Sequence, residues 1–426
     1  MSLYEQIERI KPSLSGEKLK ALENFLALGF PTKKDEEYKY THLKEITEKD
    51  YNFAPNQAHN ITKRQLDDLH LGEEHFDFLV FVNGIMHPEL SKISIESAKV
   101  LTLKNALENK EYSDFLKGYL HTLTSSENAF CQLNEALTKN GFVLHVPKNT
   151  RIERPIHVFY LSQNQEENTF YNPHNLLVVE DGAAVEIIES HHNYDNSFVL
   201  TNSVTEIFVG KNAKADWHKL QNDSQTTYLI DHTFAKQDRD SLATVNTFSF
   251  GGKLVRNNLD FIHAGENINS FMNGITIIGD NQLVDHHTAV HHKQPNCESY
   301  QNYKGIFKDQ AKGVFNGKVF VDKIAQKTNA YQQNNNILLN EGATIDTKPQ
   351  LEIFADDVKC SHGCTVGQLN EDAMFYLRAR GISKNEAQAL LLYAFANDTM
   401  QNIDIEQLKD KVSSLLAEKL EVDLSF

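Results

Sequence analysis

The chain is poor in cysteine, in basic residues and in long apolar runs. Only four cysteines occur in 426 residues, which fits reduced thiols rather than a disulfide framework. The 42 lysines and arginines are outnumbered by 58 aspartates and glutamates, so the formal net charge is -16. Because this charge repels phosphate backbones and anionic lipid surfaces, we expect neither nucleic acid nor a membrane as a partner.

Segments that would direct the chain out of the cytoplasm are also lacking. The first residues, MSLYEQIERIKPSLS, mix charged and apolar side chains and contain no apolar stretch of the kind that a secretory signal needs. The longest obvious apolar run, ALLLYAFA at 389–396, is less than half of the ~20 residues that span a bilayer. These features predict a cytoplasmic protein.

Signatures of common enzyme sites are absent. The chain contains no G-x-x-x-x-G-K-[ST] phosphate loop, no G-x-S-x-G nucleophile elbow and no H-E-x-x-H zinc motif. The stretch FSFGGKLVRNN at 248–258 has two glycines before a lysine, which is too little for a nucleotide site. We therefore expect that this chain binds no nucleotide.

Helical patterns occur at the two ends of the chain. The region 1–141 is predicted to be mainly helical, with clear helices over 15–29 and from Ser125 or Ser126 to 141. Cys131 lies within the second of these helices and is interpreted as a packing residue, because a free cysteine behaves as a small hydrophobe.

Short β-branched and aromatic runs such as FVLHV, PIHVFYL and AAVEIIES fill the region 142–368. Several runs begin with a small residue after a polar turn. The first two such residues are 30 apart and the last four are separated by 14, 18 and 15; they are Ala183, Ala213, Ala311, Ala325, Ala343 and Val358. Repeats of one strand and one turn predict a mostly β chain with a parallel β-helix core, and a β-sandwich is the alternative.

The chain returns to helix over 369–426. One segment has Asn370 as its N-cap, the next begins with the capping box of Ser383 and Glu386, and a third starts near Asp404. We expect this helical domain to close the open end of the solenoid and to offer a docking surface.

The candidate metal site is the stretch ADDVKCSHGCTVGQL at 355–369. Strand alternation places Cys360, His362 and Cys364 on one face. Neighbouring members stand ~6.6 Å apart and can share a metal ion, whereas the two cysteines are ~13 Å apart unless a bulge at Gly363 shortens the span. The stretch therefore supplies part of a ligand set that a subunit interface would complete; ordinary core packing is the alternative.

A second cluster consists of His286, His287, His291 and His292, followed by Cys297. On a strand His286 and His292 share one face and the other two histidines share the opposite face, so no neighbouring pair converges. Turn contacts and exposed polar faces are favoured here over metal binding.

Asp356 and Asp357 raise an enzymatic alternative, a β-helix carbohydrate lyase or hydrolase that uses these two carboxylates. Such enzymes are normally exported, and the first residues predict no signal. A binding or scaffold role is favoured over this reading.

Two long stretches carry a family resemblance. Residues 303–383, from YKGIF to RARGIS, and the stretch GFPTKKDEEYKYT at 29–41 resemble the SufD family of SUF iron-sulfur cluster assembly proteins, with Tyr38 where tryptophan is usual. The sequence CSHGCTVG at 360–367 also fits SufD better than its paralogue SufB. The resemblance implies a right-handed parallel β-helix flanked by N-terminal and C-terminal helical regions.

The resemblance also implies a non-catalytic scaffold subunit. The β-helix would pair with SufB, and the domain 369–426 would hold SufC, the ABC-type ATPase that hydrolyses ATP. His362 matches the histidine proposed to face a SufB cysteine where a transient iron-sulfur cluster forms, and Cys360 matches the cysteine two residues before it. Cys364 stands where alanine is common. A self-sufficient homodimer, in which two copies of this strand supply all ligands, is the remaining alternative.

Overall fold

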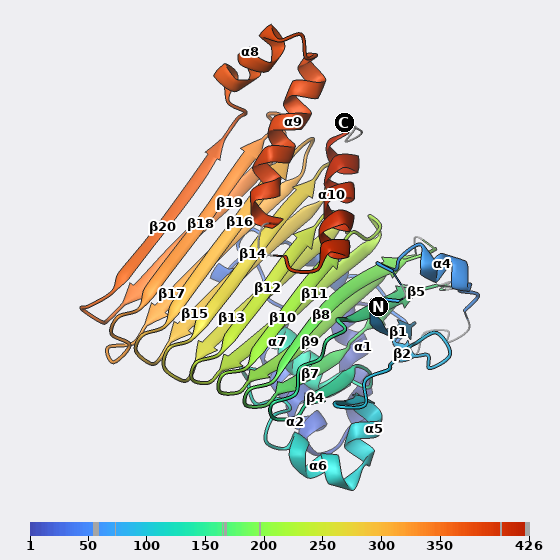
Figure 1. The fold of residues 1–426 in the computed structure, drawn as a ribbon. Helices are drawn as coiled ribbons and strands as arrows, with labels where there is room; N and C mark the ends of the chain where they lie inside the picture. Colours follow the sequence, from blue (N-terminus) through green and yellow to red (C-terminus); the bar gives the residue numbers. More distant parts are fainter. Residues whose placement is uncertain are drawn as a thin grey trace.

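The computed structural model describes residues 1–53, 59–72, 74–163, 165, 168–195, 197–400 and 403–421. Its core is a β-solenoid in which successive strands alternate between two facing sheets (Figure 1). In spatial order the first sheet, which we call the β20 sheet, contains β2 (Ile85–Met86), β1 (Asp77–Val82), β5 (Ile156–Ser162), β8 (Ala184–Asn193), β10 (Lys214–Gln221), β12 (Leu242–Ser249), β14 (Asn269–Ile278), β16 (Glu298–Phe307), β18 (Asn329–Leu338) and β20 (Lys359–Gly367).

The opposite sheet, which we call the β19 sheet, is also built mainly from parallel pairs. Only the pairs of β1 with β2 and of β3 with β4 are antiparallel. In spatial order its strands are β19 (Thr344–Ile353), β17 (Lys312–Val321), β15 (Leu283–His292), β13 (Leu254–His263), β11 (Thr227–Gln237), β9 (Val199–Val209), β7 (His174–Val179), β4 (Phe142–Val146) and β3 (Lys99–Thr102), with β6 (Thr169–Tyr171) beside β9.

The repeat of the solenoid matches the spacing of the small residues in the sequence. Lys214 of β10 pairs with Ala184 of β8, so the 30-residue step is one full turn. The later steps of 14, 18 and 15 residues are half turns, because Ala343 and Val358 directly precede β19 and β20. The prediction of a parallel β-helix over most of 142–368 is confirmed, and the sandwich alternative is wrong.

The interior changes in chemistry along the solenoid axis. Register stacks one inner residue per turn in the β20 sheet, and this row runs Ile156, Ile187, Trp217, Val245, Met272, Gln301, Gln332 and His362. The first five belong to the main hydrophobic cluster, whereas the last three are polar. Apolar burial of this kind contributes about 25 cal/mol per Å², so the first turns supply most of the hydrophobic stabilisation.

Helices of the N-terminal region cover the outer face of the β19 sheet. The predicted helix near 15–29 is confirmed as α2, which ends at Gly29 with φ 68°. The second predicted helix begins later than expected, because Asn128 rather than a serine caps it through the backbone N–H of Cys131. The helices are α1 (Leu3–Ile10), α2 (Gly16–Leu28), α3 (Lys44–Thr47), α4 (Lys63–Asp67), α5 (Leu103–Glu108), α6 (Lys110–Leu116) and α7 (Ala129–Leu137), with 3-10 turns at Lys11–Ser13 and Glu36–Tyr38.

The region 1–141 is less purely helical than expected. Its run DFLVFV forms β1, whose residues are all buried, and β1 pairs with β5 as part of the β20 sheet. The solenoid therefore begins before residue 142, because a short apolar run of this kind is as compatible with a buried strand as with a helix.

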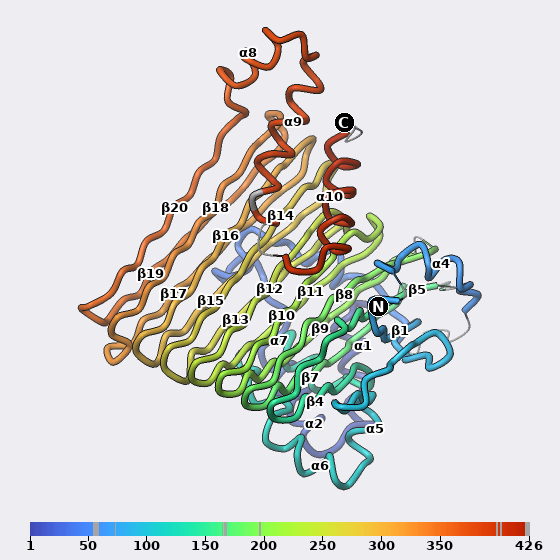
Figure 2. Tube along the Cα trace, viewed as in Figure 1, coloured from blue at the N-terminus to red at the C-terminus, as the bar shows by residue number. Residues whose placement is uncertain are grey.

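The C-terminal helices are α8 (Glu371–Ala379), α9 (Lys384–Asn397) and α10 (Glu406–Leu420), with a 3-10 turn at Asp398–Met400. The predicted caps at Asn370 and at Ser383 with Glu386 are confirmed. The expected closure of the open end is wrong: α9 and α10 pack on the outer face of the β20 sheet through an apolar cluster, whereas α8 stands beyond the end of β20 (Figure 2). Among the described residues, no helix is both long and apolar enough to cross a membrane.

Candidate functional site at the open end of the solenoid

The strand β20 is the last strand of its sheet and pairs with β18 alone within the described chain. Pairing is continuous from Asn329 with Lys359 to Ile337 with Gly367. The bulge considered at Gly363 is therefore not present. A strand of this kind presents one row of backbone N–H and C=O groups that no neighbouring strand occupies.

The inner face of β20 carries the predicted site residues. Cys360, His362 and Cys364 pair with Ala330, Gln332 and Asn334 of β18, which are 0%, 2% and 3% exposed. Side chains of paired residues in a parallel sheet project to the same side, so the three candidates continue the inner rows of the solenoid. The predicted sharing of one face is confirmed.

The three side chains differ in their surroundings. Cys360 is half-buried against an apolar cluster that includes Val321 and Ala325, and this burial raises the pKa of its thiol. Cys364 is exposed, and its Sγ lies 3.2 Å from Oγ1 of Thr347, which projects from β19 on the facing sheet. His362 is exposed to solvent. The interior of the last turn thus opens directly to solvent.

This arrangement offers an incomplete ligand set. With no bulge, Cys360 and Cys364 stay ~13 Å apart, so they cannot bind one ion together, whereas His362 lies within ~6.6 Å of either cysteine. In the part of the chain that the structure describes, three groups of at least three histidine, cysteine or carboxylate side chains lie close enough to share a metal, and none includes a residue of β20. Other ligands would have to come from another molecule.

The histidine cluster on β15 divides as the alternation predicts. His286 and His292 are buried inside the solenoid, at 5% and 0% exposure, while His287 and His291 lie on the outer face. His286 is hydrogen-bonded to Oγ1 of Thr276 at 2.9 Å. The convergence that sequence reasoning missed is between turns: His292 is in register with a histidine 29 residues earlier, at position 263.

The N-terminal stretch 29–41 is held by a buried ion pair on the outer face of the β19 sheet. The guanidinium carbon of Arg256 lies 3.9 Å from the ring centre of Tyr38, and Arg256 pairs with Asp285. Burial alone would raise the pKa of Asp285, but the charges of Arg256 and His287 hold it below its ordinary range. This part of the resemblance to SufD therefore corresponds to a structural attachment.

Glu37 strengthens the same attachment at its exposed rim. It accepts a hydrogen bond from Nδ1 of His287 at 2.9 Å and pairs with Lys318. The hydrogen bond from His287 lowers the pKa of Glu37 to about 2.

The remaining candidates have no visible chemical role. Asp356 and Asp357 are exposed in the turn between β19 and β20, where the backbone of Asp357 bonds to Lys327 and Gln326. Cys131 is 1% exposed within α7, as a packing residue would be.

Comparison with known proteins identifies the family. The description "SUF system FeS cluster assembly, SufBD core domain" matches residues 160–395, and "SufBD protein N-terminal region" matches residues 4–158. The chain is 32% identical to an iron-sulfur cluster assembly SufBD family protein of Synechocystis over 91% of this chain and 86% of that protein. It is 31% identical to the iron-sulfur cluster assembly protein SufD of Escherichia coli, over 94% of this chain and 91% of the relative. The SufD of Bacillus subtilis is 26% identical, with 87% of each chain covered. The chain belongs to the SufBD family of SUF iron-sulfur cluster assembly proteins.

Proposed function

We propose that this chain is a non-catalytic scaffold subunit, on whose last strand part of a nascent iron-sulfur cluster is held. The observation that carries the proposal is the placement of Cys360, His362 and Cys364 on the inner face of an edge strand that opens to solvent. Thiolate and imidazole suit iron, and an incomplete ligand set suits a cluster that is handed on as cargo. His362 and Cys360 are the principal ligands of this proposal, and Cys364 is an additional one.

The partner at this edge is SufB, which would extend the solenoid through its own β-helix. Strand addition to an open edge satisfies backbone groups and aligns side chains of the two proteins. Exposed apolar side chains surround the edge, with Phe354 at 64% and Val366 at 47% exposure, and would be covered by such a partner. The remaining ligands of the transient cluster would then come from SufB.

The domain 369–426 would dock SufC. The helix α8 contains no buried residue, and it exposes Phe375 at 75% and Tyr376 at 56%. Large aromatic side chains left in water at this density are typical of a protein interface. Nucleotide hydrolysis belongs to SufC in this proposal, and the complex works in the cytoplasm.

The test of the site is the substitution His362→Ala in a complex reconstituted with SufB and SufC. We expect cluster formation to fall by at least about tenfold, with unchanged assembly of the complex, because ligand loss acts on the cluster alone. His75→Ala is the matched control, since this histidine is also exposed but lies far along the chain from β20. Unchanged cluster formation in the His362 variant would refute the site.

The interface is tested by thiol labelling. Cys360 and Cys364 should react in the isolated chain, Cys364 faster, and both should become protected when SufB is added. Cys131, which is buried in α7, should stay unreactive in both states. Protection without SufB would favour the homodimer alternative, as would iron and sulfide that purify in stoichiometric amounts with the isolated chain.

A further inference from the structure

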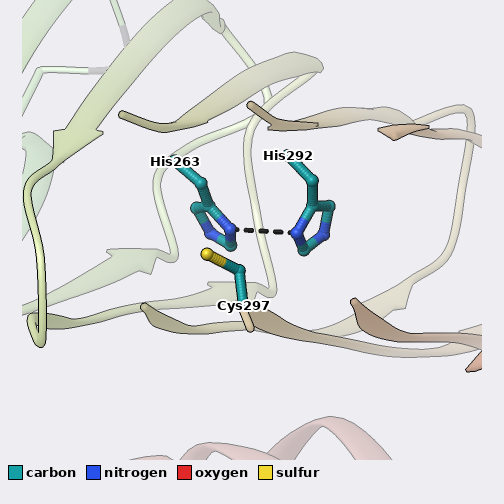
Figure 3. Close-up of side chains that lie close together, drawn as sticks. All are labelled: His263, His292 and Cys297. Carbon is teal, nitrogen blue, oxygen red and sulfur yellow. Dashed lines mark hydrogen bonds between the residues drawn. The ribbon is translucent and has the colours of Figure 1, made fainter. Parts of the chain in front are cut away.

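Three metal-binding side chains converge inside the solenoid, away from β20. His263 ends β13, His292 ends β15, and Cys297 lies in the corner before β16; each is 0% exposed. Their ligand atoms lie within 4.8 Å of one another, and the two Nδ1 atoms are 3.1 Å apart. Figure 3 shows the two rings facing each other with the sulfur beside them.

The separation of the two rings suits a shared ion. Two nitrogen ligands at ~2.0 to 2.1 Å from one tetrahedral ion are ~3.3 Å apart. The thiol needs only a small side-chain rotation to complete the triangle. Parallel register explains the convergence, because His263 and His292 are paired residues one turn apart and the corner after β15 returns the chain beneath them.

Hydrogen bonds already orient one ring for metal binding. Nε2 of Gln237 donates to the carbonyl oxygen of Asn269 at 3.0 Å, which leaves Oε1 of Gln237 to accept from the hydroxyl of Ser270. The oxygen of Ser270 in turn accepts from Nε2–H of His263. This chain fixes the tautomer of His263 and directs the lone pair of its Nδ1 toward His292. Metal-bound histidines have outer partners of this kind.

The second ring needs only a change of tautomer. Nε2 of His292 lies 2.9 Å from Oγ of Ser299, and this hydroxyl can donate or accept. If the proton of His292 moves from Nδ1 to Nε2, Ser299 accepts it by rotating its hydroxyl. The thiol of Cys297 would release its proton to solvent, and its present acceptor, the carbonyl oxygen of Gly265 at 3.4 Å, would face the ion from the remaining side.

We propose that His263, His292 and Cys297 form a buried binding site for a single late first-row transition-metal ion, Zn²⁺ or Cu⁺. One thiolate and two imidazoles are the donors that these ions share. Cu⁺ with one thiolate is neutral and needs no fourth ligand, which suits a buried site. Zn²⁺ would need a fourth ligand, for which the carbonyl of Gly265 or a water molecule is placed.

The site is sealed from the open end of the solenoid. Val321 is in register with His292 and Ala330 with Ser299, and both apolar residues are 0% exposed. The ion would therefore enter before the last turns close, and it would link two successive turns to the corner that follows them. Exchange from the folded chain would be slow.

The experiment uses the full chain with Cys360→Ser and Cys364→Ser, so that the thiols of β20 cannot bind the metal. The protein is refolded from denaturant with Zn²⁺ or, without oxygen, with Cu⁺, and bound metal is counted after gel filtration. We expect one equivalent that a chelator removes only after unfolding. The Cu⁺ arm and the Zn²⁺ arm distinguish the two ions by their competition with chelators of known affinity.

Cys297→Ala and His263→Gln in the same background should lose the bound equivalent, whereas Cys131→Ser, another buried thiol, should keep it. Refolding with Co²⁺ provides a second readout, because a thiolate-to-metal charge-transfer band appears only if Cys297 is a ligand. Less than a tenth of an equivalent with every ion, or an equivalent that survives Cys297→Ala, would overturn the proposal.

Discussion

Two parts of the same solenoid, its inner turns and its last turn, have the same backbone and opposite surroundings. Gln332 and His362 occupy one inner row one turn apart, yet Gln332 is 2% exposed and His362 is open to solvent. The strands share their length, direction and register. The difference comes from the number of neighbours, since an inner turn is covered on both sides and the last turn on one.

Titratable groups follow this difference. Burial lowers the pKa of His232 to about 3 and that of His286 to about 4, so both are neutral inside the protein. Inner histidines therefore serve hydrogen bonds within the fold, whereas the last turn presents its histidine to another molecule.

The largest expected effect on stability is the loss of a buried charge partner. Asp285→Ala leaves Arg256, whose side chain is 2% exposed, without its carboxylate. We expect the free energy of unfolding to fall by about 3 to 5 kcal/mol, because a buried unpaired guanidinium is costly. Denaturant titration measures this change.

The matched control is Glu36→Ala, which breaks the pair with Lys348 on the last turn. These side chains are 72% and 39% exposed, so the change should stay within about 1 kcal/mol. Equal effects of the two substitutions would contradict the contrast between inner and last turns.

Apolar truncation should divide the two parts in the same way. Ile187→Ala removes a fully buried side chain from the inner row and should cost about 2 to 5 kcal/mol. Val366→Ala on β20, at 47% exposure, should change stability by less than about 0.5 kcal/mol in the isolated chain. Thermal unfolding of both variants with and without SufB would show whether Val366 gains importance only in the complex.

The smallest effect is a change in the pH dependence of stability. The folded pKa of His286 lies below its ordinary value of 6.5, so the unfolded chain binds the proton first and stability falls as pH drops from about 6.5 to 4. Each such histidine contributes up to about 1.4 kcal/mol per pH unit in this window. His286→Gln should reduce the slope, and His362→Gln should leave it unchanged; a reduced slope in the second variant would show that His362 is also buried.

The sequence predicted the solenoid because its repeat is visible in small residues such as Ala343 and Val358, which start strands after polar turns. The helices that begin at Asn370 and Ser383 were predictable from local capping chemistry. The position of α9 and α10 was not, because an apolar helix face indicates burial without naming the surface that covers it. The strand β1 was missed for a similar reason, since its short apolar run has no period of its own.

The site was predictable only within one strand. Alternation placed Cys360, His362 and Cys364 on one face, and family resemblance supplied their proposed role. The convergence of His263 with His292 depends on pairing between turns, which becomes visible only when positions 29 residues apart are aligned. Burial at each turn also depends on the number of covering neighbours, which no local pattern contains.

The open edge of β20 also sets how the last turn moves. In a solenoid each repeat is stabilised mainly by the interfaces with its neighbours, and the terminal repeat has one such interface instead of two. Local opening of β20 therefore disrupts fewer contacts than opening of β14 or β16, and its amides should exchange hydrogen faster. The strand that carries the candidate ligands can thus detach and re-form while the rest of the solenoid stays folded.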